Sequence, residues 1–181
     1  DLEVETLKNH MKDVKISKKA NMEFLEGTLN QSPVVIVKCG IGKVNAGICV
    51  QILSDLFQVT HIINTGVAGS LQAQINIGDI VISDDALYHD MDVTSLGYPL
   101  GQIPQIDTFG ADQSLAMLAK TSCEKVNPDI HVFTGRVVSG DQFISSKEVK
   151  NKIIENFHAS CTEMEGAAIA HASYLNGIPF V

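Results

Sequence analysis

Tryptophan is absent from this chain of 181 residues, and arginine occurs only once, at position 136. With 13 basic residues against 21 acidic ones, the chain carries a formal charge of −8 at pH 7. Binding to a nucleic-acid backbone depends on basic patches, so this balance argues against a nucleic-acid partner. The shortage of arginine also argues against a reaction that uses phosphate.

Long apolar runs are missing as well. No uninterrupted stretch reaches the roughly 18 apolar residues that span a bilayer, and residues 1–5 are acidic, unlike a secretory signal. The four cysteines, Cys39, Cys49, Cys123 and Cys161, lie far apart without a CxxC pair. That spacing argues against zinc or redox chemistry and favours reduced thiols. We therefore expect a cytoplasmic protein with no membrane partner.

Several common catalytic motifs are absent too. Residues 40–44, Gly-Ile-Gly-Lys-Val, fit neither the P-loop spacing nor G-x-G-x-x-G, and no G-x-S-x-G nucleophile elbow occurs. Residues 88–92, Tyr-His-Asp-Met-Asp, offer one histidine and two aspartates, which is a poor ligand set for zinc. We expect neither a metal nor an organic cofactor.

Apolar spacing predicts strands that alternate with helices. The expected helices cover residues 43–58, 112–126 and 165–175, the second starting near Asp112 or Ser114. A further helix is expected to begin at a cap formed by Ser145 or Ser146 and to end at about residue 157. The expected strands are a hairpin of residues 22–27 and 33–39, then 61–66, 78–84, 132–139 and 161–164. Residues 94–111, rich in glycine and proline, predict a long functional loop. This order indicates one α/β layered domain with a central, largely parallel sheet.

Ligands of such sheets bind where strand ends meet helix starts, which directs attention to residues 40–44, 64–69, 139–144 and 163–166. Glycines in the first two loops either bring the backbone close to a ligand or only make tight turns. Phe143 either stacks on a flat ring or packs in the core. Glu163 and Glu165 either cap the helix that follows or hold the diol of a sugar.

Six stretches of the chain, taken in order, match the motifs of one enzyme family. They are Gly40–Val44, Ile63–Gly69, Gly78–Asp84, Tyr88–Pro104, Val138–Ile144 and Glu163–Ala170. The chain thereby resembles the bacterial 5′-methylthioadenosine/S-adenosylhomocysteine nucleosidases of the nucleoside phosphorylase superfamily. The resemblance implies a three-layer αβα sandwich with a central mixed, mostly parallel sheet. It also implies that water displaces adenine from C1′ of a thioadenosine, without metal or cofactor.

The resemblance assigns roles around the ribose. Glu3 would orient the attacking water, Glu165 would hold the ribose hydroxyls, and Met164 would pack on the sugar. Glu163 belongs to the same motif and is assigned to the substrate site. At position 67 the family usually has a serine that helps to hold the water, whereas Val67 cannot donate a hydrogen bond, so we expect an effect on efficiency.

The resemblance also assigns the base and the 5′ substituent. Phe143 would stack on adenine, and the backbone of Ile144 would read its edge. The pocket for the 5′-alkylthio group would be built, partly from the second subunit of a homodimer, by Ile41, Val93, Leu96, Tyr98 and Pro104. The family usually has an aromatic residue at position 96, so Leu96 would alter substrate preference.

The ends of the chain suggest a further expectation. The sequence begins without methionine and stops at residues 178–181, which read as the opening of a buried strand. We expect a domain that is truncated at both ends. The resemblance places the general acid, an aspartate of an S-D motif, on the strand that begins at Ile178 and beyond Val181. Residues 1–181 alone are therefore expected to be inactive and unstable.

Three other functions fit parts of the sequence. A purine nucleoside phosphorylase would need arginine near residues 65–67, and none lies there. A non-catalytic nucleoside-binding protein would tolerate Val67. A hydrolase of another adenine nucleoside, such as a futalosine-type substrate, fits the residues of the 5′ pocket less well.

Overall fold

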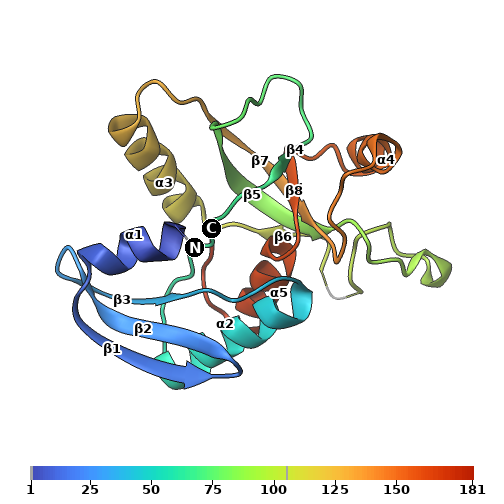
Figure 1. Ribbon diagram of the computed structural model, residues 1–181. Coiled ribbons are helices and arrows are strands. Elements are labelled where there is room, and N and C mark those ends of the chain that lie inside the picture. Colours follow the sequence, from blue (N-terminus) through green and yellow to red (C-terminus); the bar gives the residue numbers. More distant parts are fainter. Residues whose placement is uncertain (1, 105) are drawn as a thin grey trace.

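The computed structural model describes residues 2–104 and 106–181, without the side chains of residues 2 and 3 (Figure 1). Its helices are α1 (Leu2–His10), α2 (Lys43–Phe57), α3 (Gln113–Val126), α4 (Lys147–Phe157), α5 (Gly166–Asn176) and the 3₁₀ turn η1 (Thr94–Leu96). Its strands are β1 (Lys12–Lys19), β2 (Met22–Leu29), β3 (Ser32–Val37), β4 (Gly69–Ser70), β5 (Ile80–Tyr88), β6 (Phe109–Gly110), β7 (Val132–Ser139) and β8 (Cys161–Glu163). No helix in these ranges is long and apolar enough to cross a membrane.

β1, β2 and β3 form an antiparallel sheet of their own. The predicted hairpin is confirmed, because β2 pairs with β3 as far as Leu29 opposite Ser32. Asn30 and Gln31, with φ of 47° and 70°, make the two-residue turn between them. The sequence pattern does not predict β1, whose lysine-rich residues are exposed along nearly the whole strand. Lysines on such an edge strand discourage pairing with other chains.

The central sheet has five strands in the order β4-β8-β7-β5-β6. Its middle is parallel, since β7 pairs in parallel with both β5 and β8. The two-residue strands β4 and β6 add antiparallel edges. The expectation of a mixed sheet with a parallel centre is therefore confirmed.

Two apolar cores lie on opposite faces of this sheet. Ala86 and Tyr88 of β5 lie in the core shared with α2 and α5, whereas Leu87 lies with Val138 and Phe157 in the core beneath α4. This alternation follows from the side-chain period of a strand. Figure 1 shows α4 across the strands from α2 and α5, so helices cover both faces in three layers.

The sequence offers two candidate caps for α3 and two for α4. The structure selects Asp112, whose Oδ1 accepts the backbone N–H of Leu115 at 2.8 Å. It also selects Ser146, whose Oγ accepts the N–H of Val149 at 3.4 Å. Each cap satisfies a donor that no helical carbonyl can reach.

The prediction of a buried strand over residues 61–66 is wrong. This segment forms one parallel bridge, Ile62 opposite Phe180. The N–H of Ile62 donates to Pro179, that of Val181 donates to Ile62, and that of Asn64 donates to Val181. Residues 61–66 form no strand, and only Ile62 among them is buried, with Ile63 70% exposed. The long loop predicted over residues 94–111 contains η1 and β6.

Candidate functional site

Three of the four candidate loops meet where α2 and α5 begin. The backbone N–H of Gly42 donates to Oε1 of Glu165 at 2.6 Å, and the N–H of Lys43 donates to Oδ1 of Asp141 at 2.9 Å. Both donors belong to the start of α2, where N–H groups lack helical acceptors. Gly42 has a φ of 95°, a conformation that glycine adopts without strain. Two carboxylates from distant loops thus hold the glycine loop.

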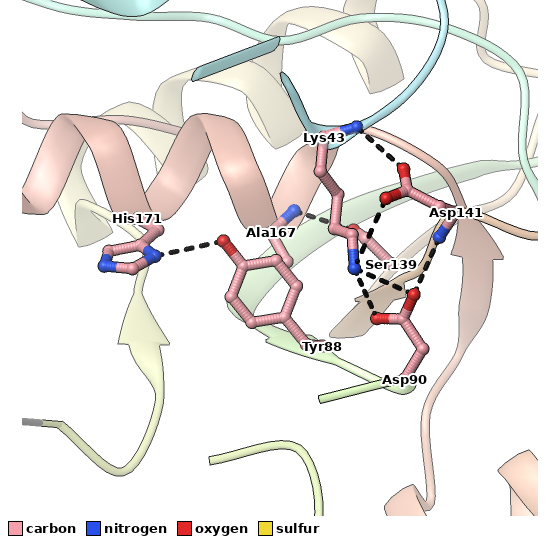
Figure 2. Close-up of polar contacts among 7 residues, drawn as sticks. All are labelled: Lys43, Tyr88, Asp90, Ser139, Asp141, Ala167 and His171. Atoms are coloured by element: carbon pink, nitrogen blue, oxygen red, sulfur yellow. Dashed lines mark hydrogen bonds and ion pairs between the residues drawn. The ribbon is translucent and has the colours of Figure 1, made fainter. Parts of the chain in front are cut away.

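Glu163 is surrounded by donors at the junction of β8 and α5. Its Oε2 accepts the N–H groups of Glu165 at 2.9 Å and Gly166 at 2.6 Å, and its Oε1 accepts the hydroxyl of Ser139. Ser139 is fully buried, and its Oγ accepts the N–H of Ala167 at 2.7 Å (Figure 2). Burial raises the pKa of the Glu163 carboxyl above its ordinary value despite these hydrogen bonds. Both oxygens of Glu163 are thus engaged in holding the start of α5.

The expected contact residues on these three loops are open to a ligand to different degrees. The side chains of Ile41 and Phe143 are exposed, the latter by 84%. Ile144, Met164 and Glu165 are half-buried. Of the two carboxylate oxygens of Glu165, only Oε1 has a hydrogen-bond partner among the described residues. The loops therefore combine a fixed carboxylate with an exposed aromatic ring.

The fourth candidate loop is placed by the sheet. Val67 is 89% exposed and lies just before β4. Within β4, Gly69 pairs with Thr162 of β8, the residue before Glu163. The loop that carries Val67 therefore leads into the strand beside the one that ends at Glu163.

The remaining expected residues lie outside these loops in the sequence. Leu96, Tyr98 and Pro104 belong to the segment of residues 94–104, and Val93 immediately precedes it. Within the described part of the chain, no hydrogen bond joins that segment to the other candidate loops. Glu3 belongs to α1, and its side chain lies outside the described part of the structure.

Lys43 occupies the centre of a polar cluster that the sequence pattern does not reveal (Figure 2). Its Nζ donates to both carboxylate oxygens of Asp90 at 2.8 Å and lies 3.5 Å from Oδ2 of Asp141. It also lies 5.4 Å from the ring centre of Tyr88, whose hydroxyl is 3.0 Å from Nδ1 of His171. Burial, with Asp90 and Asp141, raises the pKa of Tyr88 to about 12. The available sequence signal was that each aspartate follows a strand end by two residues.

Arg136, the single arginine, forms hydrogen bonds within the central sheet and to the end of α4. Its Nε and one terminal nitrogen donate to the two carboxylate oxygens of Asp85 at 2.8 and 2.6 Å. Another terminal nitrogen donates to the carbonyl of Phe157 at 3.4 Å. A bidentate pair of this kind is among the stronger polar contacts in proteins. The arginine is thus occupied in joining β5 and β7.

Comparison with known proteins finds relatives over the whole chain. The model of the phosphorylase superfamily matches residues 1–181. A 5′-methylthioadenosine/S-adenosylhomocysteine nucleosidase of Staphylococcus aureus is 42% identical over 180 residues, which cover 99% of this chain and 78% of the relative.

Two solved structures are also similar. One is such a nucleosidase from Colwellia psychrerythraea in complex with adenine, with a TM-score of 0.94 and 41% identity, covering 98% of this chain and 74% of that one. The other comes from Neisseria meningitidis in complex with methylthio-immucillin-A, with a TM-score of 0.95 and 36% identity, covering 98% and 78%. The expected αβα fold agrees with these likenesses.

Proposed function

Since the chain belongs to the family of 5′-methylthioadenosine/S-adenosylhomocysteine nucleosidases within the phosphorylase superfamily, we propose that it hydrolyses the N-glycosidic bond of these two nucleosides. The oxygen of water bonds to C1′ of the ribose while the bond from C1′ to the base breaks. The water gives up one proton and the base takes up one, so that the base leaves as adenine. The products are adenine and the free thio-ribose. The reaction needs no metal and no cofactor.

The observation that carries this proposal is the hydrogen bond from Gly42 to Glu165. It fixes the orientation of the carboxylate and leaves the second oxygen to accept the ribose hydroxyls. Positive charge develops on the sugar as the glycosidic bond breaks, and a fixed carboxylate stabilises that charge. Met164, next to Glu165, supplies an apolar surface for the sugar. Glu163 holds the start of α5, which follows both residues.

The base and the thioether would contact loops other than the one that carries Glu165. The exposed ring of Phe143 offers a stacking surface for adenine, and the Ile144 backbone is adjacent for its polar edge. The apolar thioether needs a surface that excludes water, and Ile41 would form one part of that surface. The rest of that surface would come from Val93, Leu96, Tyr98 and Pro104.

The attacking water would be held by Glu3. Activation of a water by a carboxylate is the usual general-base arrangement. Val67, exposed on the neighbouring candidate loop, offers no donor to that water. We therefore propose that Glu3 acts without the hydroxyl that serine would provide.

The placement of Arg136 favours hydrolysis over phosphorolysis. A phosphorylase must bind phosphate, for which arginine is well suited. The single arginine of this chain is instead paired with Asp85 and the carbonyl of Phe157. Water is therefore the more suitable nucleophile for this site.

We also propose that the protein works as a homodimer in the cytoplasm. A groove of about 290 Å³ lies between α2 and α5, and Val44 and Leu175 are exposed along it. Its other lining residues are Lys43, Gly47, Tyr88, Ala168, His171 and Ala172. Apolar surface of this kind is typical of association sites. A second copy could bring its segment of residues 94–104 to the substrate site. The four free cysteines fit a reducing compartment.

A substrate panel tests the activity. The full-length protein is incubated separately with 5′-methylthioadenosine, S-adenosylhomocysteine, futalosine and inosine, and the released base is measured by liquid chromatography. The proposal expects release from the first two at rates at least about tenfold above the others, which corresponds to about 1.4 kcal/mol of discrimination. Faster release from futalosine would assign the related hydrolase activity, and binding without release would assign a sensor.

A further inference from the structure

The ammonium group of Lys43 joins three loops that the chain brings together from distant positions. Lys43 is the first residue of α2, Asp90 follows the end of β5 by two residues, and Asp141 follows the end of β7 by two residues. The ammonium contacts both aspartates, as Figure 2 shows. One side chain thus sets the spacing of all three loops.

Backbone hydrogen bonds close the cluster into a ring. Asp141 accepts the N–H of Lys43 at 2.9 Å, and the N–H of Asp141 donates to Oδ2 of Asp90 at 2.8 Å. Each pair among the three residues is therefore joined directly. A ring of this kind resists a change in loop spacing more than an isolated surface pair does.

The surroundings restrict the ring further. The side chains of Lys43 and Asp90 are each only 24% exposed, so solvent screens their attraction less than at an open surface. A Cβ placed on Gly140 would lie 2.9 Å from Cγ of Asp90 and would also clash with the ring of His89. Burial would raise the pKa of Asp90, but Lys43 and the N–H of Asp141 outweigh it and lower the pKa. The loops are packed tightly around a charged pair.

The expected substrate contacts lie close to this ring along the chain, although no member of the ring is one of them. Ile41 precedes Lys43 by two residues, Val93 follows Asp90 by three, and Phe143 follows Asp141 by two. Ile41 and Val93 would contact the thioether, and Phe143 would contact the base. A change in loop spacing would therefore alter the distance between the two subsites.

We propose that Lys43 is a positioning residue, which through Asp90 and Asp141 holds the adenine and thioether subsites at the separation that a 5′-thioadenosine requires. This inference rests on the proposed function. Holding the loops before the ligand arrives lowers the cost of ordering them on binding. A ligand that touches both subsites benefits from this, whereas a ligand that touches one does not.

Two ligands separate this role from a merely structural one. Methylthio-immucillin-A would span both subsites, and adenine would occupy one. Their affinities for the full-length protein are measured by titration calorimetry in wild type and in Lys43→Met, Lys43→Arg and Asp141→Asn variants. Lys152→Met is the matched control, because Lys152 forms an exposed pair with Glu148 on α4.

We expect Lys43→Met to lower the affinity for methylthio-immucillin-A by about tenfold or more, and the affinity for adenine by less than about threefold. Lys43→Arg, which can still grip both carboxylates, should restore the first affinity to within about threefold of wild type. Equal weakening of both ligands, or no weakening, overturns the proposal. If Lys43→Met does not fold, Asp141→Asn is used instead, and its affinity losses for the two ligands are compared in the same way. The asparagine amide keeps an acceptor for the Lys43 N–H but loses the charge.

Failure of the proposed function gives a different result. A wild-type protein that releases no adenine from 5′-methylthioadenosine contradicts the activity itself, before any variant is made. An active wild type whose Lys43→Met variant shows an unchanged affinity ratio contradicts only the positioning role.

Discussion

The backbone N–H of Gly42 donates a 2.6 Å hydrogen bond to Glu165, which lies 123 residues further along the chain. The contact brings the start of α2 against the start of α5. It also depends on glycine, because Gly42 has a φ of 95° and a Cβ there would lie 3.2 Å from Oδ1 of Asp141. The glycine loop, which by itself is a weak indication of a site, is thereby held against the Glu165 carboxylate.

Replacement of Glu165 by glutamine should remove most of the catalytic power. The amide keeps the shape of the side chain but loses the charge that stabilises the developing positive sugar. We expect kcat/KM for 5′-methylthioadenosine to fall by about 10- to 100-fold, because hydrogen bonds to charged groups contribute about 1.5–3 kcal/mol. Glu155→Gln, on the exposed side of α4, is the control and should leave kcat/KM unchanged. Similar values for the two variants would contradict the assignment of Glu165.

Replacement of Val67 by serine should raise activity. A serine hydroxyl can donate to or accept from the attacking water, and one hydrogen bond is worth about 1 kcal/mol, or about fivefold in kcat. Val67→Ala shortens the side chain without adding a hydroxyl and separates the two effects. The idea fails if serine and alanine give the same kcat.

The pH dependence of stability should report Glu163. Its pKa is raised from 4.5 in the folded state, so the folded protein holds this proton more tightly than the unfolded chain. The free energy of unfolding therefore contains a contribution that falls as pH rises from about 4.5 through the raised pKa. Ser139→Ala removes a hydrogen bond that lowers this pKa, so the fall should extend to higher pH.

Urea unfolding between pH 4.5 and 8 measures this effect. Ser139→Ala should also cost about 1–3 kcal/mol overall, because buried partners lose their hydrogen bonds. The exposed Ser122→Ala on α3 serves as the control, with a pH profile parallel to that of wild type. A parallel profile for Ser139→Ala as well would contradict the coupling of Ser139 to Glu163.

A charge in the α2–α5 groove should disrupt the proposed dimer. Leu175 is exposed at this groove, and Leu175→Glu would bury a carboxylate in an interface between two copies. Sedimentation velocity should show a dimer for wild type and a monomer for this variant. Leu118→Glu, on the exposed face of α3, should remain a dimer. A wild-type monomer, or a dimeric Leu175→Glu variant, would place the interface elsewhere or remove it.

The parts of the fold that sequence predicts well are those in which local signals and burial agree. The β-branched run that becomes β7 is bounded as expected from Val132 to Ser139. The two helix caps, Asp112 and Ser146, are recognisable because their side chains act within one turn. By contrast, β1 has no apolar alternation, and it exists because β2 supplies its hydrogen-bond partners.

The site shows the same division. The glycine loop and the Glu163–Glu165 motif were identifiable, because strand ends followed by helix starts are recurrent ligand sites. The cluster around Lys43 was not, because its two aspartates lie 47 and 98 residues away in sequence. Nothing local in a lysine at the start of a helix indicates such partners. The distinction between Glu163, with both oxygens engaged, and Glu165, with one, likewise depends on tertiary contacts.

The identity of the sugar released from 5′-methylthioadenosine by the full-length protein decides between hydrolysis and phosphorolysis. The reaction is run with and without inorganic phosphate, and the sugar is identified by mass spectrometry. Hydrolysis would give free 5-methylthioribose and adenine in equal amounts under both conditions, at the same rate. A phosphorylated sugar, or adenine release that depends on phosphate, would contradict it.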